Sequence, residues 1–513
     1  MPTERPKGRY MLMNVFDPGE IRIAICRGEE LEEFYLERSR EHTLTGNIYK
    51  GRVENIVPSL QAAFVNIGEK RNGFLHISDV IFPDGGYRGL LPKRRRKKPT
   101  GDKRDLTIQD VLYPGQELLV QVTKDGVGQK GPALTTYLSL PGRYLVLMPA
   151  LHKKGVSRRI EDEETRKRLK DALRTLSMEN MGIIVRTAGA NVKLEDLKQD
   201  LKYLRSLWNA IKRTVKAAQA PAPVYQESDL VLRAIRDIFT DDMSVCLIDE
   251  ENTCNRVREF MRALLPKAVN KIKFFDERVP IFDYFGVEEQ ISALSRRHIP
   301  LERGASIVID QTEALVAIDV NTGRLKEGSL DETLLKTNLI AAKEIAHQIM
   351  LRDLSGLIVI DFIDMERNDH REKLYKAFCG YMEKDRARKT IGKLSEFCVL
   401  ELTRQRKRAS LERALYRRCP LCDGRGFMEN VETTALSLLR KVRKAMATEK
   451  VVKVEAKVHP DVALALLNER RRDVSQLEDY YDCGVTVIAD SSFAPGEISV
   501  IAQLENDEKI VIQ

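Results

Sequence analysis

The sequence predicts a multidomain protein that combines α/β and α+β architecture. Its 513 residues are too many for one ordinary hydrophobic core and indicate three or more modules. Short strand patterns separated by tight turns fill residues 47–80, which is typical of a small barrel. An apolar strand, an amphipathic helix and a second apolar strand follow one another over residues 314–364, which predicts a parallel crossover in a covered sheet.

Composition is typical of a folded, intracellular protein. Apolar residues make up 43% and charged residues 31% of the chain, so it can build a core. No apolar run is long enough to cross a bilayer, and the first residues contain no secretory signal, which excludes an integral membrane protein and argues against secretion. Eight cysteines form no disulfide framework, so we expect a cytoplasmic protein. The net charge of +9 mildly favours a polyanionic partner.

Strand patterns continue on both sides of the predicted barrel. Ile21, Ile23 and Ile25 alternate with other residues between two turn signals, and a strand at 31–36 follows, so we expect a meander. Six basic residues at 93–98 lie between two prolines and are expected to form a loop. Beyond this run, strands are expected at residues 116–123 and 133–140.

The rest of the chain alternates helix and strand patterns. Charged helices are expected at residues 161–176 and 194–217, with a buried strand between them. The proline-rich residues 219–223 are expected to be a linker. Helix, strand, helix and strand patterns then occur at residues 229–239, 244–248, 254–265 and 272–275. Arg-rich helices are expected up to residue 418, and residues 430–513 are predicted to form a small α+β module.

Two strands of the crossover carry aspartates where the pattern otherwise predicts burial. Because side chains alternate across a sheet, Asp319 and Asn321 share one face. Asp361 follows four apolar residues, and Asp364 lies just beyond that strand. A buried carboxylate is costly unless it is paired or bound to a metal. Both strands end near these acids, where open α/β sheets usually bind ligands.

These residues favour a magnesium site. Two carboxylates and an amide oxygen suit Mg²⁺, which could activate water and neutralise charge on a phosphate under attack. The alternative is that the acids cap helices or pair with Arg at the ends of the sheet. The nearby acids Asp310, Glu313 and Glu366 leave the complete ligand set open.

Cys419 and Cys422 form a CxxC turn that is rich in glycine. Such a turn lets two thiolates grip one Zn²⁺, but a structural zinc site normally needs four ligands. No second CxxC exists in the chain, so a second copy of the turn from another subunit is the simplest completion. A redox dithiol and an ordinary turn with free thiols are the alternatives.

Aromatic and basic residues could bind nucleic acid. Phe64 and Phe74 could stack bases, unless both are core residues. Arg186 and Thr187 could hold a terminal phosphate, although an Arg paired at the end of a strand is the simpler interpretation. The neighbouring strands also carry Tyr49 and three basic residues, Lys50, Arg52 and Arg71. Arg-rich stretches that could line a phosphate channel, or form solvated helix faces, lie at 385–388 and 403–408.

Together, these segments resemble the ribonuclease E/G family of bacterial endoribonucleases. The resemblance covers nearly the whole chain, and the motifs occur in the order of the family. The matching stretches are NIYKGRV, SLQAAFV, GFLHISDV, IVRTAG, SIVIDQTEALVAIDVNTG, DLSGLIVIDFIDM, DRAR, TRQR and CPLCDGRG.

The resemblance implies roles for residues of this sequence. It places a catalytic Mg²⁺ on Asp319 and Asp361, with Asn321 assisting, and a structural Zn²⁺ shared between two protomers on Cys419 and Cys422. It implies a homodimer joined by zinc, which could pair further into a homotetramer. It implies a pocket that senses a 5′-monophosphate at Gly142, Val146, Arg186, Thr187 and Arg388. It implies RNA contacts at Phe64, Phe74 and Lys130.

The resemblance also divides the chain into parts. A ribonuclease-H-like subdomain is expected in two pieces, residues 1–42 and 219–280. An OB-fold RNA-binding barrel with a basic insertion at 86–104 is expected at 43–130, followed by the 5′-end sensor region at 131–218. The remaining parts are a deoxyribonuclease-I-like catalytic subdomain at 281–415, a zinc link at 416–428 and a small C-terminal α+β domain at 429–513.

The expected function is that of a Mg²⁺-dependent endoribonuclease that cuts single-stranded RNA and leaves a 5′-phosphate. The resemblance implies roles in rRNA and tRNA processing and in mRNA decay. The chain resembles the short, ribonuclease G branch of the family, so we expect no long C-terminal scaffold for other decay proteins. The alternatives are a non-catalytic RNA-binding or ribosome-assembly factor and a metal-dependent deoxyribonuclease.

Overall fold

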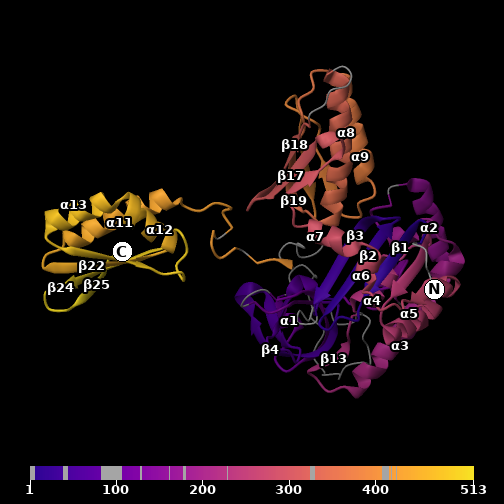
Figure 1. The fold of residues 1–513 in the computed structure, drawn as a ribbon. Coiled ribbons are helices and arrows are strands. Elements are labelled where there is room, and N and C mark those ends of the chain that lie inside the picture. Colours follow the sequence, from indigo (N-terminus) through magenta and orange to yellow (C-terminus); the bar gives the residue numbers. More distant parts are fainter. Residues whose placement is uncertain are drawn as a thin grey trace. The chain divides into compact units, whose positions relative to one another are not determined.

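The computed structural model separates the chain into two compact units, Met1–Leu411 and Glu412–Gln513 (Figure 1). The basic run at 93–98 lies outside the residues that the structure describes. Within the described part, none of the helices combines the length and the apolar character needed to cross a membrane. The structure describes residues 6–38, 44–81, 107–126, 130–160, 162–176, 181–227, 229–323, 330–406, 415–417, 419–422 and 424–512.

The first sheet joins two segments that are far apart in the sequence. β1 (Arg9–Asn14) pairs antiparallel with β2 (Glu20–Arg27) and parallel with β14 (Met243–Ile248). β3 (Glu30–Arg38) and β15 (Ile272–Phe274) complete the order β15-β14-β1-β2-β3. The core on one face includes residues of α4 (Leu230–Asp237) and α5 (Glu251–Leu264), and the core on the other includes residues of α6 (Ile281–Tyr284) and α7 (Val287–Ala293).

The predicted barrel is present and closed. Its five strands close because β4 pairs with both β5 and β7. They are β4 (Ile48–Val57), β5 (Ala62–Asn66), β6 (Gly73–His76), β7 (Glu117–Lys124) and β8 (Ala133–Thr135), and the short α1 (Ile108–Val111) precedes β7. The linker predicted at 219–223 is wrong in part, because β13 (Ala222–Tyr225) pairs with β4 at the edge of this sheet.

A four-stranded sheet with two helices follows the barrel. Its order is β11-β12-β10-β9. The strands are β9 (Leu140–Pro141), β10 (Leu145–Met148), β11 (Lys154–Val156) and β12 (Gly182–Val185). α2 (Glu163–Thr175) and α3 (Leu194–Ala217) confirm the two charged helices predicted here. Each helix buries an apolar stripe against this sheet and exposes most of its charged side chains, with Asp200 of α3 as a buried exception.

The crossover region forms a six-stranded sheet in the order β16-β17-β18-β19-β21-β20. Helices α8 (Leu330–Leu351) and α9 (Asn368–Met382) lie on the same side of the strands (Figure 1). The strands are β16 (His298–Pro300), β17 (Ser306–Gln311), β18 (Leu315–Asn321), β19 (Gly356–Asp361), β20 (Lys389–Ile391) and β21 (Val399–Arg404).

Two expectations about this region are wrong. Among the described residues, the sheet is covered on one face only, because the inward residues of β17, β18 and β19 are buried against α8 and α9 while their neighbours on the other face are half-buried or exposed. We call this second side the open face. In addition, the Arg-rich stretch is not continuously helical, since β20 and β21 are strands.

The C-terminal unit contains a four-stranded sheet in the order β23-β22-β24-β25, with helices on it. β22 pairs parallel with β23 and antiparallel with β24, which confirms a small α+β module. The strands are β22 (Val451–Val458), β23 (Gly484–Ala489), β24 (Ile498–Leu504) and β25 (Lys509–Ile512). The helices are α11 (Val431–Met446), α12 (Pro460–Leu464) and α13 (Arg471–Tyr481), with a π-helical turn at Ala465–Glu469.

Candidate active site

The two aspartates predicted to bind a metal lie directly opposite each other. β18 and β19 run parallel, and their register pairs Asp319 with Asp361 near the carboxyl ends of both strands. Asn321 lies on the same face as Asp319, and its Nδ2 donates to Asp319 Oδ2 at 2.8 Å. We call Asp319 and Asp361 the acid pair. This edge of a parallel strand pair is where open α/β sheets present ligand-binding groups.

The acid pair is exposed, so the expectation that these carboxylates interrupt buried strands is wrong. Both side chains project from the open face, while Ile318 and Ile360 point into the core beneath. Partial burial raises the pKa of Asp361, and the negative charges of Asp319 and Asp364 raise it further. Concentrated negative charge, and not burial alone, is therefore the feature that favours a cation here.

The positions of the nearby acids leave Asp319 and Asp361 as the best candidates for metal ligands. In the described part of the chain, neither member of the acid pair has an Arg or Lys as an ion-pair partner. Asp310 on the same face is paired with Arg297. Glu313 lies in the turn between β17 and β18, at the opposite end of β18 from Asp319. The predicted pairing of these acids with Arg thus applies to Asp310 and not to the acid pair.

The acid pair fits a cation that binds through few protein ligands. No group of three or more His, Cys, Asp or Glu among the described residues is arranged to hold a metal. Two carboxylates and the Asn321 amide are hard oxygen donors that suit Mg²⁺, which keeps several waters and also binds substrate phosphate. They do not form a closed cage of the kind that structural Zn²⁺ needs.

Arg186 lies at the end of β12 and is already bound by protein groups. Its Nη1 donates to the backbone oxygen of Gly142 at 2.5 Å and to Asp237 Oδ1 at 2.6 Å. The Thr187 hydroxyl follows it and lies 3.4 Å from Ser157 Oγ. The structure therefore brings Gly142, Arg186 and Thr187 together. In this structure Arg186 is paired with a carboxylate, Asp237, at the end of its strand, which is the simpler of the two interpretations given above.

Gly142 and Val146 belong to the β9–β10 hairpin, and a buried carboxylate holds its turn. Asp200 of α3 accepts the backbone N–H groups of residues 143–145 at 2.8–3.1 Å. A Cβ at position 142 would lie 2.6 Å from Asp200 Oδ2, so only glycine fits there without a shift. Val146 pairs with Pro141 on the adjacent strand and is half-buried.

Arg388 lies just before β20 and is exposed. Its neighbour Arg386 donates to the backbone oxygen of Asp237 at 3.3 Å, and the backbone oxygen of Arg386 accepts from Arg159 at the same distance. These contacts hold the segment that carries Arg388 against the residue that pairs with Arg186. The five residues predicted to form the sensor therefore lie on three neighbouring segments. These are the β9–β10 hairpin with Gly142 and Val146, the end of β12 with Arg186 and Thr187, and the segment before β20 with Arg388.

Phe64 and Phe74 lie on the outer face of the barrel and not in its core. They are opposite each other on β5 and β6, with ring centroids 5.9 Å apart and an interplanar angle of 69°. Both are half-buried, while the residues that alternate with them are buried. Lys130 is exposed, three residues before Ala133, which pairs with Phe74. The exposed ring pair favours base stacking over a core role.

Three of the expected neighbours of this aromatic pair lie elsewhere. Tyr49 is buried in the barrel core, and Lys50 is buried with its Nζ bonded to backbone oxygens of Val215 and Ala218 at 3.4 and 2.9 Å. Arg52 donates to the backbone oxygen of Ala220 at 3.0 Å. Lys50 and Arg52 fasten the barrel to residues 215–220 and Tyr49 fills the barrel core, so the three do not form the predicted platform beside the aromatic pair.

Arg404 belongs to one of the two stretches expected to line a phosphate channel. Its guanidinium is instead buried between two carboxylates, pairing with Asp353 at 2.6 Å and with Asp385 at 2.9 Å. A side chain that is only 4% exposed cannot present charge to a polyanion. The prediction that Asp385 and Arg404 line a phosphate channel is wrong, because the two residues form a buried ion pair.

Cys419 is exposed and Cys422 is half-buried in the C-terminal unit. The Gly426 N–H donates to Cys422 Sγ at 3.4 Å, and this hydrogen bond and others from nearby residues lower the pKa of the Cys422 thiol. A lowered pKa favours the thiolate, which is the form that binds metal. One chain provides only this pair, since the described residues hold no third ligand beside it.

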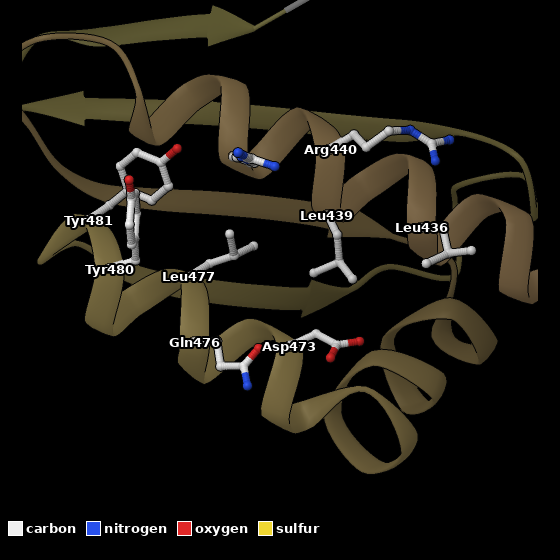
Figure 2. Close-up of a pocket in the computed structure, with 9 residues that line it drawn as sticks. Leu436, Leu439, Arg440, Asp473, Gln476, Leu477, Tyr480 and Tyr481 are labelled. Atoms are coloured by element: carbon white, nitrogen blue, oxygen red, sulfur yellow. The ribbon is translucent and has the colours of Figure 1, made fainter.

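The same unit has a groove of about 470 Å³ between α11 and α13 (Figure 2). Leu439 and Leu477 face each other across it, and Arg440, Tyr480 and Tyr481 also line it. The groove holds no pair of carboxylates and no Cys, so it resembles neither the acid pair nor the predicted zinc link.

Two protein-family models match the chain. The model of the ribonuclease E/G family matches residues 139–407, more than half of the chain, and includes the acid pair and Arg186. The chain belongs to the ribonuclease E/G family. A second family model, the RNase E/G thioredoxin-like domain, matches residues 418–503 and thus the C-terminal unit.

Relatives match the ribonuclease E/G chain over almost its whole length. It is 39% identical to ribonuclease E of Haemophilus influenzae over 506 residues, which cover 98% of this chain and 52% of that relative. It is 35% identical to ribonuclease G of Escherichia coli over 492 residues, covering 96% of this chain and 99% of that relative. The chain thus spans about half the length of the ribonuclease E relatives and almost all of ribonuclease G.

Sequence reasoning missed two carboxylates that organise the segments predicted to sense a 5′ end in this ribonuclease E/G protein. Asp200 interrupts the apolar stripe of α3 between Leu197 and Leu201, and a carboxylate on the buried side of a helix is a readable signal. Asp237 ends α4, and no local pattern reveals that it faces Arg186, which lies 51 residues earlier.

Proposed function

We propose that this ribonuclease E/G protein is a cytoplasmic, Mg²⁺-dependent endoribonuclease that cuts single-stranded RNA. The observation that carries the proposal is the register of β18 and β19, which sets two carboxylates and an amide side by side on the open face of the sheet. Its relatives are named ribonuclease E and ribonuclease G, which supports RNA as the substrate. We further propose rRNA and tRNA precursors and mRNA as substrates.

Each residue of the site has a defined task in this proposal. Asp319 and Asp361 hold the cation, and the Asn321 amide fixes the rotamer of Asp319 through the 2.8 Å hydrogen bond. A bound Mg²⁺ would supply charge neutralisation at the scissile phosphate and activation of water. Negative charge alone would repel a polyanion, so a pure RNA-binding surface would not place these acids here. The product keeps a 5′-phosphate on its downstream fragment.

Segments outside the sheet would orient the RNA. Phe64 and Phe74 present a half-exposed pair of rings that can stack on bases, with the Lys130 ammonium for the backbone phosphates. Arg186 would exchange its single hydrogen bond to the Asp237 carboxylate for a 5′-monophosphate, which offers more acceptor oxygens and more charge. The Gly142 turn, Val146, Thr187 and Arg388 would complete that pocket.

A shared zinc site would join two protomers. Cys419 and Cys422 supply two of the four ligands of a closed tetrahedral site, and a two-fold axis would supply the same pair again. This would make the homodimer the basic assembly, and such dimers could pair further into tetramers.

Mapping of product ends tests the proposed reaction. Purified protein should cut a short, unstructured, 5′-monophosphorylated RNA only when Mg²⁺ is present, and the downstream product should carry a 5′-phosphate. A DNA of the same sequence is the control and should remain intact. Binding of the RNA without any cleavage would favour a non-catalytic RNA-binding or ribosome-assembly factor, and cleavage of the DNA at a similar rate would favour a deoxyribonuclease.

A further inference from the structure

The backbone that follows Asp361 is held by two buried side chains from other elements. β19 ends at Asp361, and residues 362–365 lead away from it past Asp364. Phe362 and Met365 in this segment are buried in the core beneath the sheet. We call residues 362–365 the exit segment. Its path decides where the Asp361 and Asp364 carboxylates lie relative to Asp319.

Asn338 of α8 forms the first of these contacts. Its side chain is fully buried, yet the carbonyl and the amino group of its amide each have a partner on the backbone of a single residue, Ile363. The Nδ2 donates to the backbone oxygen of Ile363 at 2.8 Å, and the Oδ1 accepts the N–H of the same residue at 3.1 Å. A buried amide is costly without such partners, so this side chain and the exit segment depend on each other.

Cys398 forms the second contact, just before β21. Its backbone oxygen accepts the Phe362 N–H at 3.2 Å, and its Sγ accepts the Met365 N–H at 3.3 Å. The residue is fully buried and has a φ of 56°, in the left-handed region where few non-glycine residues occur. This conformation aligns both acceptors with the exit segment. Cys398 and Asn338 together bind three of its four N–H groups.

We propose that Asn338 and Cys398 are positioning residues that set the geometry of the acid pair for Mg²⁺. The inference rests on the proposed function, because it assumes that Asp319 and Asp361 bind the cation. Neither side chain touches the cation or RNA. Each acts through the exit segment, as groups that orient metal ligands do, and loss of such groups typically lowers metal affinity by roughly 10–100-fold.

Calorimetric titration with Mg²⁺ alone tests this inference without an activity assay. Asn338→Leu removes both hydrogen bonds at similar volume, and we expect its Mg²⁺ dissociation constant to rise by about tenfold or more. The matched control is Gln348→Leu, because Gln348 is also a buried amide on α8 but bonds only to Glu344 and Arg352 of that region. It should lose stability and keep wild-type Mg²⁺ affinity.

A second pair of variants covers the case in which Asn338→Leu fails to fold. Cys398→Ser keeps an acceptor for the Met365 N–H, whereas Cys398→Ala removes it. We expect near wild-type Mg²⁺ affinity for the serine variant and weaker binding for the alanine variant, and amide hydrogen exchange at Met365 should quicken only in the latter. Wild-type Mg²⁺ affinity and exchange in Cys398→Ala would overturn the inference.

Asp361→Asn separates this inference from the proposed function. If Asp361→Asn loses Mg²⁺ binding while Asn338→Leu and Cys398→Ala titrate like wild type, the positioning role is refuted and the metal site stands. If Asp361→Asn binds Mg²⁺ as wild type does, the acid pair is not the metal site, and both the proposed function and the positioning role fall.

Discussion

Asp361 shows how charge at one residue links metal binding to pH. Its pKa is raised above the ordinary value of 3.8 by partial burial and by the negative charges of Asp319 and Asp364. A group with a raised pKa in the folded state stabilises the fold below its unfolded pKa, and this contribution is lost as pH rises through the folded pKa. Without Mg²⁺, the protein should therefore lose stability over the window just above pH 3.8.

Mg²⁺ should reverse this trend, because it binds the ionised carboxylate and competes with the proton. We expect the Mg²⁺-induced rise in unfolding temperature to grow with pH through this window and then level off. Unfolding temperatures measured against pH with and without Mg²⁺ check the prediction. Asp361→Asn is the control and should show a much smaller effect, whereas equal pH dependence in both proteins would contradict the assignment.

Arg186 is the residue on which the proposed 5′-end sensing depends. Arg186→Ala should lower cleavage of 5′-monophosphorylated RNA toward the rate for a 5′-hydroxyl RNA, since a charge-assisted contact contributes about 1.5–3 kcal/mol. Arg174→Ala on α2 is a matched control, because Arg174 is exposed and pairs only with Asp171 one helical turn away. The ratio of cleavage rates on the two RNAs is the measurement.

A variant of Asp237, the partner of Arg186, tests the same pocket in the opposite direction. Asp237→Asn removes the carboxylate that occupies Arg186, so the preference for a monophosphate end should persist or increase. A full preference in Arg186→Ala, or its loss in Arg174→Ala, would place the sensor elsewhere.

At the scale of elements, the Arg404 network ties β21 to the segments beside it. Burial alone would raise the pKa of Asp385, but Arg404 and the Ala387 N–H lower it below its ordinary value. Asp385 therefore contributes stability above its unfolded pKa, and this stability is lost as pH falls through its folded pKa.

Arg404→Met should cost about 3–5 kcal/mol, because it leaves Asp353 and Asp385 buried without a cation. Chemical denaturation at neutral pH measures the loss. Arg406→Met is the control with little expected effect, since Arg406 is exposed and bonds to Ser355 Oγ at 3.2 Å. A loss below about 1 kcal/mol in Arg404→Met would contradict the importance of the network.

The elements that the sequence predicted correctly are those with a strong local pattern. The apolar runs of β18 and β19, and the turn-bounded strands of the barrel, are readable from periodicity. β13 was missed because Pro221 and Pro223 suggest a linker, yet a proline such as Pro223 is tolerated in an edge strand. β21 was not separated from the predicted Arg-rich helices because the last of its inward positions, after Leu400 and Leu402, is Arg404, and only distant acids make that Arg a buried residue.

For the candidate site too, local sequence patterns predict some features and not those that depend on distant residues. Alternation places Asp319 and Asn321 on one face, and this follows from the sequence alone. The pairing of Asp319 with Asp361 depends on the register of β18 against β19, which local sequence does not determine. The partners that hold the exit segment, Asn338 and Cys398, come from a helix and a loop, and no spacing rule connects them to Asp361.

At the scale of the whole molecule, the zinc link predicts the assembly. Native mass spectrometry with metal analysis should find one Zn²⁺ for every two chains. Cys419→Ser combined with Cys422→Ser should release the Zn²⁺ and shift the protein toward monomer. Cys483→Ser is the control, because Cys483 is buried in the core of the C-terminal unit. One Zn²⁺ per chain in a stable monomer would refute the shared site.

The central claim is that the acid pair forms the Mg²⁺ site for RNA cleavage. Its most direct test is the rate at which wild type, Asp361→Asn and Asp310→Asn cut a short 5′-monophosphorylated RNA at increasing Mg²⁺, with RNA affinity measured alongside. Asp310 is the matched control, because it lies on the same open face but is paired with Arg297.

We predict that Asp361→Asn loses cleavage by roughly a hundredfold or more while its RNA affinity stays within a few-fold of wild type. Asp310→Asn should cleave like wild type. Wild-type cleavage by Asp361→Asn at ordinary Mg²⁺ concentrations would contradict the claim.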